Sequence, residues 1–183
     1  MAMVHTPTFY TADMVHALPD DGQRYELVWG ELLVTPAPTY RHQDLVLRLY
    51  RYFAEYCDTY VAAKAMCSPA DISWGEDTVI QPDVFVFPRN EGIAAEWSSI
   101  KTLLLVAEVL GPSTQRHDRF NKRRLYQERD VSVLWLVDGD NDSVEVWSPH
   151  AEFPVIEGKE LRWHPDGAAA PLVIALAELF KKQ

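Results

Sequence analysis

The chain has 183 residues, 48% of them hydrophobic, which is enough to bury the core of one domain over residues 1–183. Its formal charge of −10 at pH 7 argues against a protein that coats nucleic acid through a bulk positive field. Its two cysteines, Cys57 and Cys67, form no CxxC pair, which argues against a disulfide framework and against a thiolate zinc site.

The N-terminal segment MAMVHTPTFY, residues 1–10, contains neither a basic leader nor an apolar h-region. No apolar run in the chain approaches the roughly 18 residues that a membrane span requires. We therefore expect a cytoplasmic protein that does not bind membranes.

The first half of the chain predicts a hairpin, a helix and further strands. Residues 24–35 are typical of two short strands around Gly30, where the missing Cβ permits a turn. From His42 to about Tyr56, apolar residues recur at three- and four-residue intervals and predict an amphipathic helix. Antiparallel strands are predicted over residues 59–67, 70–74 and 79–87.

The second half predicts a strand, a helix, a hairpin and a last helix. The nearly continuous apolar run at 103–110 indicates a central strand buried on both faces. A helix capped by Ser113 or Thr114 then runs to about Glu128. The remaining predicted elements are a strand at 131–138, its hairpin partner at 143–148, and a closing amphipathic helix at 171–182.

Two carboxylates occur in these apolar strand-like runs. Asp83 follows Pro82, which has no N–H to give to a ladder and so marks the start of its strand, and Glu108 lies near the end of the run at 103–110. A carboxylate is costly to desolvate, so a buried one usually has a partner. One divalent cation could hold both acids, and Mg²⁺ suits a site that supplies one or two carboxylates.

Lys122 lies three residues before Leu125 and four before Tyr126, so its stem shares the helix face that packs on the sheet. Attack of water on a phosphodiester needs a cation for the charge that develops, and Lys122 could orient the water or stabilise that charge. The alternative is structural. Asp83 would then cap a turn, Glu108 would pair with an arginine, and Lys122 would pair with Glu108 as a buried ion pair.

The helix that carries Lys122 is locally basic although the chain is acidic. Its candidates for contact with nucleic acid are Arg116, Arg119 and Arg123. The same arginines are equally consistent with a solvated helix face that forms ion pairs with acidic neighbours.

Several short motifs occur in an order and spacing that resemble a known family. They are YELVWGEL (25–32), RHQ (41–43), QPD (81–83), EVLGPST (108–114), the D-x-x-x-K-x-x-x-Y of Asp118, Lys122 and Tyr126, and LWLVD (134–138). Over nearly the whole chain the sequence resembles the Uma-two family of bacterial proteins, a branch of the PD-(D/E)XK nuclease superfamily. The resemblance implies an α/β fold with a restriction-endonuclease-like core, in which helices flank a central mixed sheet, and an N-terminal β-hairpin.

The resemblance also implies that Asp83 and Glu108 bind Mg²⁺ or Mn²⁺, with the backbone carbonyl of Val109 as a further ligand. The sequence departs from the superfamily pattern at Leu110, which stands where a lysine follows the acid by two residues. The family resemblance implies that this lysine has moved to the following helix, as Lys122. A second departure is Gly111, where relatives often carry a serine.

Three further residues are candidates for the site. Glu26 and Glu31 both lie in the first hairpin, and a strict period of two would place them on opposite faces, so that at most one faces the site. We favour Glu31 slightly as an additional ligand of the metal or of water. His42 shares the apolar face of its helix, where it is either a core histidine or a phosphate donor or proton carrier.

We therefore expect a magnesium-dependent endonuclease that hydrolyses phosphodiester bonds, with DNA as its substrate. A symmetric homodimer is expected because two related sites most simply cut both strands. The alternative is a non-catalytic module that keeps the nuclease fold and binds nucleic acid or protein. A glycan hydrolase with paired carboxylates ranks last, because it leaves Lys122 unexplained.

Overall fold

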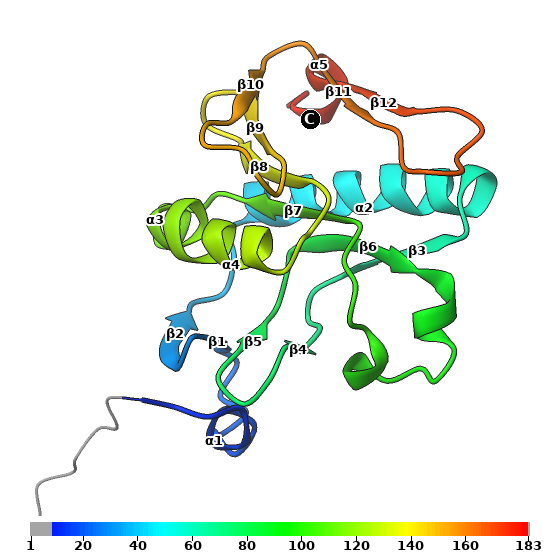
Figure 1. Cartoon of the computed structure of the whole chain (residues 1–183). Coiled ribbons are helices and arrows are strands. Elements are labelled where there is room, and N and C mark those ends of the chain that lie inside the picture. Colours follow the sequence, from blue (N-terminus) through cyan, green and yellow to red (C-terminus); the bar gives the residue numbers. More distant parts are fainter. Residues whose placement is uncertain (1–8, 183) are drawn as a thin grey trace, which may run out of the picture.

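The computed structural model describes residues 9–182 (Figure 1), so most of the N-terminal segment discussed above, residues 1–8, lies outside the described residues. The strands are β1 (Arg24–Val28), β2 (Glu31–Thr35), β3 (Ala63–Cys67), β4 (Ile72–Ser73), β5 (Val79–Ile80), β6 (Val84–Pro88), β7 (Leu105–Val109), β8 (Leu134–Asp138), β9 (Ser143–Trp147), β10 (Val155–Glu157), β11 (Glu160–Trp163) and β12 (Leu172–Ala175). The helices are α1 (Ala12–His16), α2 (Tyr40–Tyr60), α3 (Gln115–His117), α4 (Arg123–Glu128) and α5 (Leu176–Leu179). A π-helical turn, Asp118–Lys122, joins α3 to α4, and 3₁₀ turns lie at Arg89–Gly92 and Trp97–Ser99.

The main sheet has six strands in the order β10-β9-β8-β7-β6-β3. It is mixed, because β7 runs parallel to β8 and antiparallel to β6. The parallel pair requires a crossover, which the helical segment from α3 to α4 supplies. A second sheet has the order β2-β1-β5-β4, and β11 pairs with β12. The predicted mixed sheet is therefore confirmed, with the apolar run at 103–110 as a central strand.

Successive side chains along the strands of the main sheet point to opposite faces, and each face has its own hydrophobic core. Val84, Val86 and Leu105 share one core with the buried stripe of α2. Phe85 and Val106 share the other core with the buried residues of α4. The two helical layers accordingly lie on opposite faces of the sheet (Figure 1). Residue 108 has the same parity as residue 106, so the side chain of Glu108 enters the second core.

The hairpin and the long helix of the first half are confirmed, and its later strands are confirmed only in part. The predicted strand at 79–87 divides around Pro82, which has no N–H for a ladder, into β5 and β6 in different sheets, and residues 59–60 belong to α2. The strands β1 and β2 pair antiparallel around Gly30, whose φ of +79° lies in the left-handed region that glycine tolerates. The helix α2 extends the predicted range by a few residues at each end and begins at Thr39, whose hydroxyl accepts the N–H of His42. Within residues 9–182, no helix is both long enough and apolar enough to cross a membrane.

The predicted closing helix at 171–182 is wrong in its first half. Leu172–Ala175 forms the strand β12, which pairs with β11, and only Leu176–Leu179 is helical. In this strand Leu172 and Ile174 are buried whereas Val173 is exposed, which is a period of two. Pairing with β11, which the sequence analysis did not predict, fixes that period and overrides the helical pattern.

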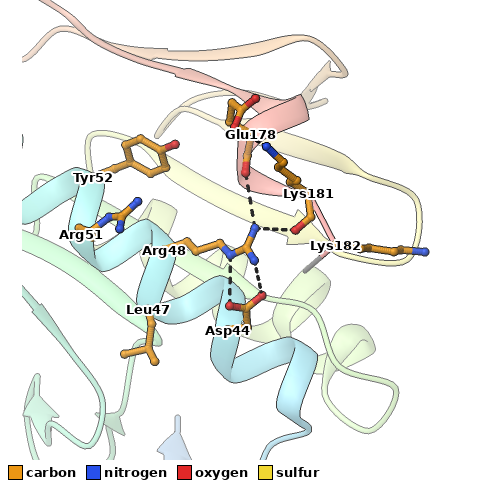
Figure 2. A pocket seen from close by; sticks show the side chains of 8 residues that line it. All are labelled: Asp44, Leu47, Arg48, Arg51, Tyr52, Glu178, Lys181 and Lys182. Carbon is orange, nitrogen blue, oxygen red and sulfur yellow. Dashed lines mark hydrogen bonds and ion pairs between the residues drawn. The ribbon is translucent and has the colours of Figure 1, made fainter.

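Arginines of α2, chiefly Arg48, fix the short helix α5 to α2. Arg48 donates to the backbone carbonyl of Lys181 at 2.7 Å, and the carboxylate of Asp44 holds the same guanidinium at 2.9 Å (Figure 2). Arg48 also donates to the backbone carbonyl of Leu179 at 3.1 Å. These carbonyls follow the end of a helix, where partners within the helix are missing. Arg48 therefore explains how a helix of four residues keeps a defined position at the end of the chain.

Candidate active site

Four elements bring charged side chains to one buried place. They are β1 with Glu26, the residue before β6 with Asp83, β7 with Glu108, and the π-helical turn with Lys122. The exposed fractions of these residues are 1%, 3%, 1% and 0%. Charges buried to this degree must be paired or must bind a cation, so the group forms one electrostatic unit. We call Glu26, Asp83, Glu108, Asp118 and Lys122 the buried cluster.

Lys122 is the centre of the buried cluster. Its Nζ lies 2.7 Å from Glu108 Oε1, 2.9 Å from Glu26 Oε1 and 3.9 Å from Asp118 Oδ1. The Tyr126 hydroxyl, one helical turn further on, also donates to Glu108 Oε1. The structure therefore places the helix-borne lysine beside the β7 acid, a contact that both the relocated lysine of a nuclease and the purely structural ion pair would make.

The π-helical turn explains why so many residues of one helix reach the buried cluster. Asp118, Lys122 and Tyr126 are spaced by four, and in an α-helix of 3.6 residues per turn each step of four overshoots a full turn. A π-helical turn contains more residues than an α-helical turn, so the four-residue step from Asp118 to Lys122 covers less than one full turn. This deficit offsets the excess rotation of the α-helical step from Lys122 to Tyr126. The expected uninterrupted α-helix would have spread these three side chains over a wider face.

Asp83 is held by donors from three directions. Its Oδ1 accepts Arg24 Nη1 at 2.9 Å, and its Oδ2 accepts the backbone N–H of Val109 at 2.9 Å. His42 Nε2 lies 3.2 Å from the same Oδ2, so this residue of α2 belongs to the site. The backbone N–H of Asp83 in turn donates to Glu108 Oε2 at 3.2 Å. The two acids of adjacent strands are thereby fixed against each other.

Glu26 lies in the buried cluster, whereas Glu31 does not. The carboxylate of Glu26 accepts the backbone N–H of Gln81 at 2.8 Å in addition to Lys122, while Glu31 is exposed and lies 3.5 Å from Asn121 Nδ2. The expectation of opposite faces is wrong. The two-residue turn pairs Val28 with Glu31, and directly paired residues share a face, so Glu26 and Glu31 lie on the same side of the hairpin. The two residues differ in their position along the hairpin: Glu26 lies in the middle of β1, whereas Glu31 begins β2 beside the turn.

Sequence analysis did not identify Arg24 as a site residue. It precedes Glu26 by two positions, so both side chains lie on one face of β1, and Arg24 Nη2 is 3.6 Å from Glu26 Oε2. The arginine-x-glutamate spacing in a predicted strand was the available signal. Asp118 is the first residue of the D-x-x-x-K-x-x-x-Y motif, but the sequence alone assigned no function to it.

The helix arginines take part mainly in contacts within the protein. Arg119 pairs with Glu145 at 2.7 Å and with Asp138 at 3.3 Å. Arg123 donates to Gln127 and its guanidinium lies 4.6 Å from the ring centre of Trp147. Arg116 is exposed and forms no ion pair within residues 9–182. The geometry thus favours the ion-pair interpretation for Arg119 and leaves Arg116 as the arginine most available to a ligand.

A cleft of about 910 Å³ opens over one side of the buried cluster. Its walls include Arg24, His42, Asp83 and Val109. The loops at 35–39 and 110–114 complete its rim. Of the four carboxylates in the buried cluster, only Asp83 lines the cleft, and Glu108 and Lys122 lie behind it. Clefts of this size commonly hold a small ligand or a part of a larger one.

The buried cluster carries more negative than positive charge. Four carboxylates face two permanent cations, Lys122 and Arg24, which leaves two negative charges uncompensated when all the acids are ionised. Burial, together with the neighbouring acids, raises the pKa of Glu108 to about 8, and burial raises the pKa of Asp118 to about 6. Burial alone would lower the pKa of Lys122, but Glu108 and Glu26 outweigh it and raise that pKa.

We expect the free energy of unfolding to fall as the pH rises from about 5 to about 8 in a chelating buffer. Glu108 and Asp118 have pKa values above those of the unfolded chain, so the folded protein holds more protons in this window and loses stability as they leave. Asp83 has a lowered pKa, because His42 and Arg24 outweigh its desolvation, and its contribution is lost only at more acidic pH.

Urea denaturation across this pH range would measure the loss, which should be on the order of 1–3 kcal/mol. Glu108→Gln has no proton to release at this position and should show a shallower decline. A stability that rises through the window would contradict the proposed protonation of the buried cluster.

Comparison with known proteins places the chain in a family. The model of the Uma2 (Uma-two) family, described as "Putative restriction endonuclease", matches residues 12–175. The chain belongs to the Uma2 family. A crystal structure described as "a putative nuclease belonging to DUF820" from Anabaena variabilis ATCC 29413 is similar to this Uma2 protein with a TM-score of 0.76 and 22% sequence identity, over 93% of this chain and 97% of that one. No curated protein matches the chain.

The structural likeness confirms the mixed α/β fold that was expected. At 22% identity the likeness shows the fold alone, and the chemistry depends on the residues of the site. Membership in the Uma2 family and the fold together support a nuclease, that is, a hydrolase that acts on nucleic acid.

Proposed function

We propose that this protein is a nuclease that uses Mg²⁺ or Mn²⁺ to hydrolyse phosphodiester bonds of DNA in the cleft beside Asp83. The observation that carries the proposal is the charge of the buried cluster, in which four carboxylates face only Lys122 and Arg24. When these acids are ionised, two negative charges beside the cleft lack a partner, and one divalent cation would compensate them and favour that ionised state. Family membership supplies the class of reaction.

The residues present fit magnesium better than zinc or calcium. With the side chains as they are placed, held by Arg24 and Lys122, no three His, Cys, Asp or Glu residues within 9–182 form the ready-made cluster that a structural zinc or calcium site would require. Mg²⁺ needs only one or two carboxylates and keeps several waters. Asp83, Glu108 and the Val109 carbonyl would hold it. Glu26 would add a further oxygen, because its buried Oε2 accepts no hydrogen bond from the described residues.

A bound cation would polarise the phosphoryl oxygen and lower the pKa of the attacking water. The chain's own residues prepare the site. Lys122 is fully buried among carboxylates, so we assign it a positioning role in which it aligns Glu108 and opposes the rise that burial causes in the pKa of that acid. His42 lies at the cleft wall with its Nε2 on Asp83, where it orients that carboxylate; its Nδ1 is buried, so donation to a phosphate oxygen would require the ring to move.

One observation favours the non-catalytic module as the second candidate. The oxygens of Asp83 already accept hydrogen bonds from Arg24 and Val109, and Lys122 is fully enclosed, which is how a purely structural ion network would look. Such a module would bind DNA equally well with and without Mn²⁺. Calorimetric titration with Mn²⁺ alone separates the two candidates, because the nuclease requires binding that depends on Asp83.

We expect purified protein to nick supercoiled plasmid when Mg²⁺ or Mn²⁺ is present and to stop when a chelator is added. Glu108→Gln keeps the shape but replaces one acceptor oxygen by an NH₂ donor and cannot carry a negative charge, so it should reduce nicking by roughly 100-fold or more. Glu55→Gln, which makes the same change at an exposed position of α2, should nick like the wild type. Equal nicking by all three proteins would point to a contaminating nuclease and would refute the assignment.

A further inference from the structure

The guanidinium of Arg24 bridges two of the carboxylates assigned to the cation. Its Nη1 lies 2.9 Å from Asp83 Oδ1, and its Nη2 lies 3.6 Å from Glu26 Oε2. A divalent cation bound by the same two acids would need the space between them. Two positive groups cannot share that space, so either Arg24 or the cation occupies it.

Arg24 is held much less firmly than Lys122. Its side chain is 23% exposed at the wall of the cleft, whereas that of Lys122 is fully buried among three acids. The buried Nε of Arg24 has no hydrogen-bond partner among the described residues. Arg24 is also the first residue of β1, so its side chain leaves the sheet at a strand end that faces the cleft. Of the two cations of the site, Arg24 is therefore the one that can move.

Charge favours the exchange. With all four acids ionised and Arg24 in place, the four carboxylates and two cations sum to −2. With a divalent cation in place and the guanidinium outside, the same groups sum to −1, so the cluster is better compensated. The guanidinium would then stand free in the cleft with its planar fork of donors, which matches a phosphate in two-point contact.

We propose that Arg24 fills the place of the cation when none is bound, and that cation binding moves its guanidinium into the cleft, where it binds the phosphate of the substrate. This inference rests on the proposed function. It assigns to Arg24 two opposite effects, since the side chain competes with the metal and supports the substrate. A residue that only stabilised the fold would favour both kinds of binding together.

The first test follows Arg24 in the unaltered protein. In a chelating buffer, the guanidinium held by Asp83 and Glu26 should give resolved ¹⁵N–¹H side-chain signals by NMR, assigned through their loss in Arg24→Lys. Titration with Mg²⁺ should broaden or shift them to the values of a freely rotating guanidinium. Signals that stay unchanged at saturating Mg²⁺ would overturn the proposal.

The second test compares metal and substrate binding in Arg24→Gln. Calorimetry should give a dissociation constant for Mn²⁺ at least about tenfold lower than in the wild type, because a nearby competing charge is gone. The KM for plasmid DNA should rise by about tenfold in the same variant, because a bidentate phosphate contact is lost. Arg162→Gln, an exposed arginine paired with Glu160, controls for net charge and should change neither value.

The possible outcomes distinguish failure of the proposed function from failure of the role proposed for Arg24. If the wild type binds no Mn²⁺, the proposed function itself fails. If the wild type binds Mn²⁺ but Arg24→Gln binds it no more tightly, or if KM does not rise, the role of Arg24 is refuted while the cation site stands. Should Arg24→Gln fail to fold, the NMR titration of the wild type still decides the question.

Discussion

Asp83→Asn is expected to abolish cleavage that depends on a metal while the protein stays folded. Asp83 is the only carboxylate of the buried cluster that lines the cleft, so it links the buried acids to the substrate. An amide keeps the shape and can still accept the N–H of Val109, but it gives a cation no charge. We expect at least a 1,000-fold loss of nicking, roughly the scale on which a catalytic electrostatic contact acts.

The measurement pairs plasmid nicking with calorimetry and with thermal unfolding. Mn²⁺ binding should disappear in Asp83→Asn, and the midpoint of unfolding should shift only modestly, since Arg24 and His42 can turn to water in the cleft. The matched control is Asp58→Asn, an exposed acid whose ion pair with Arg89 lies at the end of α2. Mn²⁺ binding that survives in Asp83→Asn would show that the cation binds elsewhere.

Lys122→Met is expected to be the most destabilising of the single changes considered. The variant keeps an apolar stem of similar length but leaves Glu26, Glu108 and Asp118 without their shared counter-ion in a site that water does not reach. Removing one partner of a buried charge pair costs about 3–5 kcal/mol. Urea unfolding near neutral pH measures this loss directly.

The loss in Lys122→Met should shrink as the pH is lowered toward about 5, because the orphaned carboxylates then take up protons instead of remaining charged. Adding Mn²⁺ should recover part of the stability if the same acids bind the cation. Lys64→Met removes an exposed lysine from β3 and should alter stability by about 0.5 kcal/mol or less. A Lys122→Met protein as stable as the wild type would remove the electrostatic basis for the site.

The two expected results give Asp83 and Lys122 different roles. Asp83 lines the cleft, whereas Lys122 is fully buried and contacts only other side chains of the protein. The lysine of a sequence motif is commonly assumed to contact the reacting water. Here its ammonium lies 2.7 Å from Glu108, so its first effect is on the ionisation and orientation of that acid.

Much of the fold was predictable because it depends on local patterns. The period of α2, the apolar run of β7 and the turn between β8 and β9 each lie within a short stretch of chain. The closing segment was mistaken because its alternation fits a strand only when β11 is present as a partner. The π-helical turn was missed because its hydrogen-bond pattern has no signature in residue type.

The same distinction holds for the site. The sequence by itself determined that Asp83, Glu108 and Lys122 would be costly to bury and would therefore need partners. Only the tertiary structure decided which partners they have. Lys122 meets Glu26 across 96 positions of sequence, and Asp83 meets Arg24 across 59. The physical reason is that the free energy of desolvating a charged residue can be inferred from the apolar run around it. The partner that offsets this free energy depends on distances between elements, which the register of the sheet and the rotation of the helix set together.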